Sequence, residues 1–102
     1  FDGIDIDWEY PGFAEHSGRP EDKRNFTLLL QAVSAALKAQ NPPLLLTIAA
    51  PAGPSHYANM EVDQIHQYLD WINIMGYDFH GPWGGEEDRL TNHQAALLPT
   101  QL

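Results

Sequence analysis

The sequence predicts an α/β fold in which three parallel strands alternate with two helices. Apolar stretches of strand length occur at residues 1–9, 44–50 and 71–79, and the segments between them repeat apolar residues with helical spacing. Strands that alternate with helices form a parallel sheet with right-handed crossovers. This order fits part of a (β/α)8 barrel or half of a doubly wound sheet. No glycine-rich phosphate loop follows the first strand, which disfavours the dinucleotide-binding form of the second architecture.

The first strand and the helix after it have clear boundaries. Residues 1–9 stop at the turn-forming sequence of residues 10–12, and a polar loop continues to residue 20. From about residue 21 to residue 39, apolar positions recur every three or four residues, which predicts a helix with one buried face. The two prolines after Asn41 end this helix. We expect five side chains on the buried face: Phe26, Leu29, Leu30, Val33 and Leu37.

The second half of the chain contains two strands and a shorter helix. Residues 44–50 are apolar apart from Thr47, a pattern typical of a strand covered on both faces. Residues 51–59 hold two prolines and a glycine and are expected to form a loop, and residues 61–69 a helix. A glycine-rich loop at residues 81–85 follows the third strand. We expect four further side chains in the core: Val62, Ile65, Leu69 and Trp71.

Charge and composition restrict the class of partner. Fourteen acidic residues against five basic ones give a formal charge of −9, which disfavours nucleic acid and anionic membranes, because both need a positive surface. The longest apolar runs are too short to cross a bilayer. The chain has no cysteine, and its five histidines lack the spacing of a metal site. The composition suits a protein that acts on a neutral polymer.

The first strand carries a row of carboxylates. Side chains on a strand alternate between its faces, so Asp5, Asp7 and Glu9 point the same way at steps of about 6–7 Å. Lost hydration and mutual repulsion raise the pKa values of such a row, and its members titrate as a coupled unit. Glu9, nearest the carboxyl end, is the candidate to stay protonated as a general acid. The residues between the acids are expected to face covering helices: Ile4, Ile6 and Trp8.

Two other readings of the acidic row are structural pairing and calcium binding. Most isolated Asp-x-Asp pairs are structural or related to a metal. An EF-hand loop that opened at Asp5 would need glycine at its sixth position and glutamate at its twelfth. Those positions are Tyr10 and His16, so the EF-hand frame fails. Apolar Ile6 and Trp8 between the acids also favour a strand over a chelating loop.

Three segments together resemble glycoside hydrolase family 18, the chitinases. Residues 2–11 resemble the family signature Asp-Gly-x-Asp-x-Asp-x-Glu, and residues 75–78 resemble its Met-x-Tyr-Asp motif on the sixth barrel strand. Residues 46–54 resemble the fifth strand of secreted members. The resemblance implies that residues 1–102 are a central fragment of one catalytic barrel, without an internal boundary, covering about strands four to six with two intervening helices. A whole barrel needs about 250 residues, so we do not expect the isolated fragment to be active.

The resemblance also implies the catalytic roles. In this family the substrate supplies its own nucleophile, the carbonyl oxygen of its 2-acetamido group. Glu9 would protonate the glycosidic oxygen and later activate water. Asp7 would orient the acetamido N–H and stabilise the cyclised intermediate, and Asp5 would share a proton with Asp7. Tyr77 would donate a hydrogen bond to the acetamido oxygen, which fixes the geometry of attack.

The same resemblance assigns residues that bind substrate. Asp78 would bind the distorted sugar, Met75 would line the floor beneath it, and Trp83 would stack on a sugar at the leaving-group side. Met75 and Tyr77 share a strand face, whereas Asp78 has the opposite parity, so the strand must end or twist there. The Glu9–Tyr10 peptide bond is expected to be cis. The substrate-binding set is Tyr10, Met75, Gly76, Asp78 and Trp83.

The function implied is hydrolysis of β-1,4 linkages between N-acetylglucosamine units, in chitin or chito-oligosaccharides. The resemblance implies no cofactor or metal, no nucleic-acid or membrane partner and an extracellular location, although no signal peptide is visible in the chain. One alternative is a chitinase-like lectin, but such relatives typically lose the position of Glu9. The other is an endo-β-N-acetylglucosaminidase that acts on N-linked glycans. Residues 46–54 and 79–83 favour chitin over this second alternative.

Overall fold

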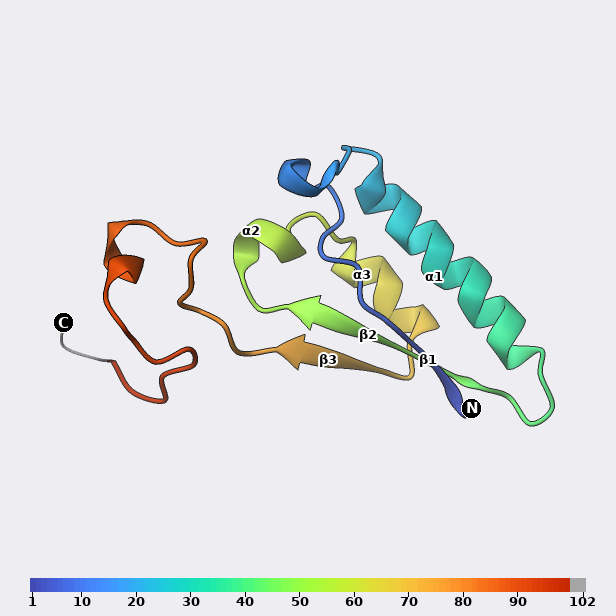
Figure 1. Cartoon of the computed structure of the whole chain (residues 1–102). Coiled ribbons are helices and arrows are strands. Elements are labelled where there is room, and N and C mark those ends of the chain that lie inside the picture. Colours follow the sequence, from blue (N-terminus) through green and yellow to red (C-terminus); the bar gives the residue numbers. More distant parts are fainter. Residues whose placement is uncertain (100–102) are drawn as a thin grey trace.

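The computed structural model describes residues 1–99, which form a parallel sheet of three strands packed against helices (Figure 1). The strands lie in the order β1-β2-β3, and both neighbouring pairs are parallel, as predicted. The elements, in chain order, are β1 (Gly3–Ile6), a 3-10 turn (Ala14–His16), α1 (Asp22–Lys38), β2 (Leu45–Pro51), α2 (Pro54–Tyr57), α3 (Val62–Ile65), a 3-10 turn (His66–Tyr68), β3 (Trp71–Met75) and a 3-10 turn (Glu86–Arg89).

The core lies between α1 and the sheet. Phe26 and Leu30 of α1 are fully buried, as are Leu46 and Ile48 of the central strand β2. The ring of Trp8, just beyond β1, packs edge-on against Phe26 with ring centroids 5.6 Å apart. Burial of each large apolar side chain contributes roughly 1.5–3 kcal/mol to stability. The buried apolar set is Phe26, Leu30, Leu37, Leu46, Ile48, Ala50, Met60 and Ile65.

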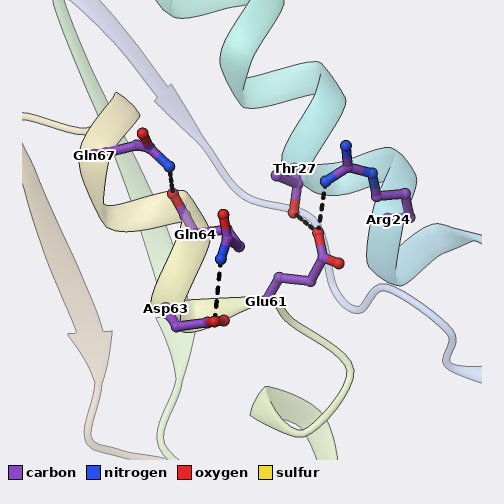
Figure 2. A network of polar contacts seen from close by, with 6 residues as sticks. All are labelled: Arg24, Thr27, Glu61, Asp63, Gln64 and Gln67. Atoms are coloured by element: carbon purple, nitrogen blue, oxygen red, sulfur yellow. Dashed lines mark hydrogen bonds and ion pairs between the residues drawn. The ribbon is translucent and has the colours of Figure 1, made fainter.

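A polar cluster joins α1 to the start of α3 (Figure 2). The carboxylate of Glu61, directly before α3, accepts hydrogen bonds from Thr27 Oγ1 at 2.5 Å and Arg24 Nη1 at 3.3 Å. The hydrogen bond from the Thr27 hydroxyl is the largest effect that holds the pKa of Glu61 below its ordinary value. The hydrogen bond and the charge of Arg24 act in the same direction. The two helices on either side of β2 in sequence are thus fixed to each other by side chains.

The boundaries differ from the sequence prediction in four segments. β1 and β3 are shorter than residues 1–9 and 71–79: β1 ends at Ile6, which pairs with Ile48, and β3 ends at Met75, which pairs with Pro51, the last residue of β2. The segment 51–59 was expected to be a loop but contains α2, whose first residue, Pro54, has a backbone already suited to a helix start. The helix predicted at residues 61–69 is α3 followed by a 3-10 turn.

Four apolar side chains expected to be buried are exposed. Leu29 is exposed because α1 covers β2 with one narrow stripe of side chains. Val62 is exposed because α3 has a single turn with Ile65 inward, and Trp71 because β3 is an edge strand. Ile4 lies on the other edge strand, β1, and only its neighbours Ile6 and Trp8 pack against the core. No helix within residues 1–99 is long and apolar enough to cross a membrane. The exposed fractions are 40% for Leu29, 54% for Val62, 52% for Trp71 and 49% for Ile4.

Candidate functional site

The acidic row lies at the carboxyl end of β1. Asp5 is within the strand, whereas Asp7 and Glu9 follow its last residue and lie at the edge of the sheet where β2 and β3 also end. Parallel strands place their carboxyl ends along one edge, and α/β proteins build their sites there. Asp7 and Glu9 therefore lie at the same edge of the sheet as the chain that leaves β3 at Gly76 and Tyr77.

Asp5 is held by side chains from both other strands. Thr47 Oγ1, on β2, donates a hydrogen bond to Asp5 Oδ1 at 2.5 Å, and Asn73 Nδ2, on β3, donates to the same oxygen at 3.3 Å. The register of the sheet places Thr47 opposite Asp5. Sequence reasoning did not assign either donor to the site. The signal was present for Thr47, because it is the single polar residue in an otherwise apolar strand and it is 5% exposed.

Asp7 has a raised pKa in the folded protein. Partial loss of hydration raises the pKa of Asp7, and three further effects act in the same direction: the charge of Glu9, a hydrogen bond to the Glu9 side chain, and the charge of Asp5. The raised pKa expected from the sequence is confirmed for this residue. Burial and both acidic neighbours therefore favour the protonated form of Asp7.

Tyr10 lies beside the carboxylates. The Glu9–Tyr10 peptide bond is cis, as the family resemblance implies. Burial raises the pKa of Tyr10 to about 12, together with a hydrogen bond to the Glu9 side chain and the charges of Glu9, Asp7 and Tyr77. The phenol of Tyr10 is therefore neutral at physiological pH. Asp7, Glu9 and Tyr77 all lie within electrostatic reach of this one hydroxyl, so the structure brings residues of both sequence motifs together.

The loop that follows Tyr10 is anchored by a buried carboxylate. Asp22, the first residue of α1, is 3% exposed and accepts hydrogen bonds from Arg19 N at 2.8 Å and Gly12 N at 3.2 Å. The hydrogen bond from the Arg19 N–H is the largest effect that holds the pKa of Asp22 below its ordinary value. The hydrogen bond from the Gly12 N–H and the charge of Arg19 act in the same direction. Gly12 has a φ of 70°, a left-handed conformation that favours glycine. The sequence predicted this loop but not its anchor.

The second motif begins on β3 and continues beyond it. Met75 is the last residue of the strand and is half-buried, and the next three residues are exposed: Gly76, Tyr77 and Asp78. Asp78 has a φ of 55°, and its N–H donates a hydrogen bond to Gln94 Oε1 at 2.9 Å. The parity argument required the strand to end or twist before Asp78, and it ends at Met75.

Trp83 lies in the segment that leaves the sheet after β3. Its side chain is 66% exposed, and its ring covers Gly81, where any larger residue would meet the indole. Figure 1 shows the segment after β3 projecting away from the sheet, with the loop of residues 81–85 in the projecting part. His80 in this segment pairs with Asp88 at 2.8 Å. Within residues 1–99, no group of three His, Cys, Asp or Glu residues is arranged to hold a metal ion.

Comparison with known proteins gives a consistent result. Residues 1–101 match the family described as glycosyl hydrolases family 18. The chain is 45% identical over 104 residues to chitinase A1 of Niallia circulans, an alignment that covers 95% of this chain and 14% of that protein. It is 44% identical over 103 residues to chitinase 1 of Aphanocladium album, which covers 95% of this chain and 22% of that protein. The chain thus spans less than a quarter of either relative.

Solved structures agree with the sequence comparison. Chitinase ChiA74 from Bacillus thuringiensis superposes with a TM-score of 0.82 at 50% identity, over 96% of this chain and 16% of that one. The chitinase domain of the spore coat protein CotE from Clostridium difficile superposes with a TM-score of 0.83 at 37% identity, over all of this chain and 29% of that one. The three-stranded sheet and its helices therefore have close counterparts within larger catalytic domains.

Proposed function

The chain belongs to the glycosyl hydrolases of family 18, and we propose that the full-length protein hydrolyses the β-1,4 linkages between N-acetylglucosamine units of chitin or chito-oligosaccharides. The observation that carries this proposal is the row of Asp5, Asp7 and Glu9 along and beyond the carboxyl end of β1, in a parallel sheet. The relatives named above are chitinases. A catalytic domain from Ostrinia furnacalis, 33% identical to this chain, was solved in complex with penta-N-acetylchitooctaose.

The proposed reaction proceeds with retention and with assistance from the substrate. Family 18 is an exception to the usual retaining mechanism, in which a second carboxylate about 5 Å from the acid attacks the sugar. Glu9 protonates the glycosidic oxygen while the acetamido carbonyl oxygen attacks the anomeric carbon, and the bond to the leaving sugar breaks. Asp7 accepts a hydrogen bond from the acetamido N–H and stabilises the cationic ring that forms. Glu9, now ionised, removes a proton from the water that opens this ring.

Asp5 and Tyr77 support these steps. A proton that moves from Asp7 toward Asp5 leaves Asp7 charged when the cationic ring forms, and the hydrogen bonds from Thr47 and Asn73 keep Asp5 in place for that exchange. Tyr77 donates its phenolic proton to the acetamido oxygen and holds that oxygen below the anomeric carbon. Hydrogen bonds directed at charge that develops in the transition state lower the barrier more than bonds to the ground state.

The remaining motif residues form the proposed sugar subsite. We assign Met75 to the floor of the subsite, Asp78 to the distorted sugar and Trp83 to the leaving-group side, where its exposed indole offers a stacking surface. Tyr10 and Gly76 border the same space beside Glu9 and Tyr77. We assign β1, β2 and β3 to strands four, five and six of a (β/α)8 barrel, and the full-length protein to the extracellular space. The reaction as proposed uses no cofactor.

The direct test is hydrolysis of a chromogenic chitobioside by the full-length protein, followed by inhibition with a bicyclic thiazoline that mimics the cyclised intermediate. Release of the chromophore and competitive inhibition by the thiazoline are expected. Covalent trapping of Asp7 by a mechanism-based fluorosugar would refute assistance by the substrate. Absence of hydrolysis, with retained oligosaccharide binding, would indicate the lectin alternative. Cleavage of N-linked glycans but not of chito-oligosaccharides would indicate the endoglycosidase alternative.

A further inference from the structure

A cluster of aromatic side chains packs at the turn that follows β1 and contains Glu9 and Tyr10. The cluster consists of Tyr10, Phe13, His16 and His56, and its members come from the loop after β1 and from α2, which follows β2. We propose that His56 is a positioning residue, which fixes the ring of Tyr10 by stacking on it and thereby fixes the Glu9 carboxyl group beside that ring. The proposal rests on the proposed function, because it concerns the efficiency of the same acid.

The stack between His56 and Tyr10 is the closest aromatic contact of the cluster. The two ring centroids lie 4.1 Å apart with an interplanar angle of 22°, an offset-parallel arrangement. Phe13 packs edge-on against both rings, at 5.2 Å and 87° from His56 and at 6.1 Å and 72° from Tyr10. A ring held on one face by a parallel partner and at its edge by a third ring has little freedom to tilt.

The backbone of the same corner is held from the other side. His16 Nδ1 lies 3.0 Å from the carbonyl oxygen of Glu9, and because a carbonyl only accepts hydrogen bonds, this nitrogen carries the proton. The His16 ring also packs edge-on against Phe13, with centroids 4.9 Å apart. Phe13 therefore joins the two histidines, one of which holds the Glu9 main chain and the other the Tyr10 ring.

The position of His56 is set by the end of β2. α2 starts three residues after Pro51, and the N–H of His56 donates to the Gly53 carbonyl oxygen at 3.2 Å. The stack consequently ties the carboxyl end of β2 to the turn at the carboxyl end of β1. The Tyr10 hydroxyl lies within electrostatic reach of Glu9, Asp7 and Tyr77. Because Tyr10 directly follows Glu9 in the chain, a shift of its ring changes the surroundings of the Glu9 carboxyl group.

Substitutions of His56 in the full-length protein separate stacking from space filling. His56→Phe keeps an aromatic face, whereas His56→Leu keeps an apolar side chain without one. For His56→Leu we expect kcat on a chromogenic chitobioside to fall about three- to tenfold, the size expected for the loss of one aromatic contact, with KM within twofold of wild type. For His56→Phe we expect kcat within twofold of wild type. His66→Ala, at an exposed histidine outside the cluster, is the matched control and should leave both constants unchanged.

The outcomes distinguish this inference from the proposed function. Wild-type kcat in His56→Leu would overturn the positioning role while leaving chitin hydrolysis intact. Equal losses in His56→Leu and His56→Phe would also overturn it, because the aromatic face would then not be the property that matters. A rise in KM with kcat at the wild-type value would assign His56 to substrate affinity and contradict the proposal. A wild-type protein that does not hydrolyse chitobiosides would refute the proposed function and, with it, this inference.

Discussion

Replacement of Thr47 by valine tests whether the hydrogen bonds around Asp5 support catalysis. The substitution keeps the shape of a buried β-branched side chain but removes the hydroxyl that donates to Asp5 Oδ1 at 2.5 Å. Asn73 remains as a donor at 3.3 Å. A hydrogen bond to a charged group is worth about 1.5–3 kcal/mol, and the lower figure applies because Asp5 is exposed. We therefore expect the free energy of unfolding to fall by about 1.5 kcal/mol.

The same change should slow the reaction. A loss of 1.4 kcal/mol of stabilisation in the transition state lowers a rate about tenfold, so kcat of Thr47→Val should fall by up to roughly that factor. KM should change little, because in the proposed reaction Asp5 acts through Asp7 and not on the sugar itself. The assay is steady-state hydrolysis of a chromogenic chitobioside by the full-length protein, with urea unfolding of the same preparation.

Thr27→Val is the matched control for this experiment. Thr27 is also buried, and its hydroxyl donates to a carboxylate, that of Glu61, at 2.5 Å, but this pair lies between α1 and α3 (Figure 2). Thr27→Val should lower the urea midpoint and leave kcat unchanged. If the two variants lost stability alike and Thr47→Val kept wild-type kcat, the link from Asp5 to the reaction would be wrong. Unchanged stability of Thr47→Val would refute the hydrogen-bond argument itself.

Two further predictions concern stability. The pKa of Asp22 is lowered in the folded state, so its contribution is fully present above about pH 4, the ordinary value for aspartate, and is lost progressively as the pH falls below that value toward the lowered pKa. The difference in unfolding free energy between wild type and Asp22→Asn, measured in urea, should therefore shrink between pH 6 and pH 3, and a difference that did not change with pH would contradict this assignment. Leu30→Ala should cost about 2–5 kcal/mol because Leu30 is fully buried on α1. Leu28→Ala, at an exposed position of the same helix, should change stability by about 0.5 kcal/mol or less, and equal losses at the two positions would show that α1 does not pack as described.

Local sequence patterns were sufficient for the order of elements and for the acidic row. The long helix α1 was predicted within one residue at each end, because its apolar spacing and the prolines after it are local signals. The alternation of strand faces also predicted that Asp5 and Asp7 lie near each other; β1 ends at Ile6, between them, and the charge of Asp5 contributes to the raised pKa of Asp7. Each of these features depends on residues less than about twenty positions apart, so no knowledge of the tertiary structure was needed.

Features that depend on distant segments were missed. The donors to Asp5 are 42 and 68 positions away in sequence, and their placement follows from the strand register, which the sequence did not define. The exposure of Trp71 had a similar origin, since burial of an edge strand depends on what packs beside it. The stack of His56 on Tyr10 was also missed, because the short helix α2 that carries His56 was expected to be a loop.

The measurement that tests the account most directly is the activity of Glu9→Gln in the full-length protein. Glutamine keeps the size and hydrogen-bonding capacity of the side chain but cannot donate the catalytic proton. We predict that the variant binds chito-oligosaccharides with affinity close to wild type, measured by calorimetry, while hydrolysis of the chromogenic chitobioside falls on the order of 10²-fold or more. Turnover close to that of the wild type would contradict the assignment of Glu9 as the general acid.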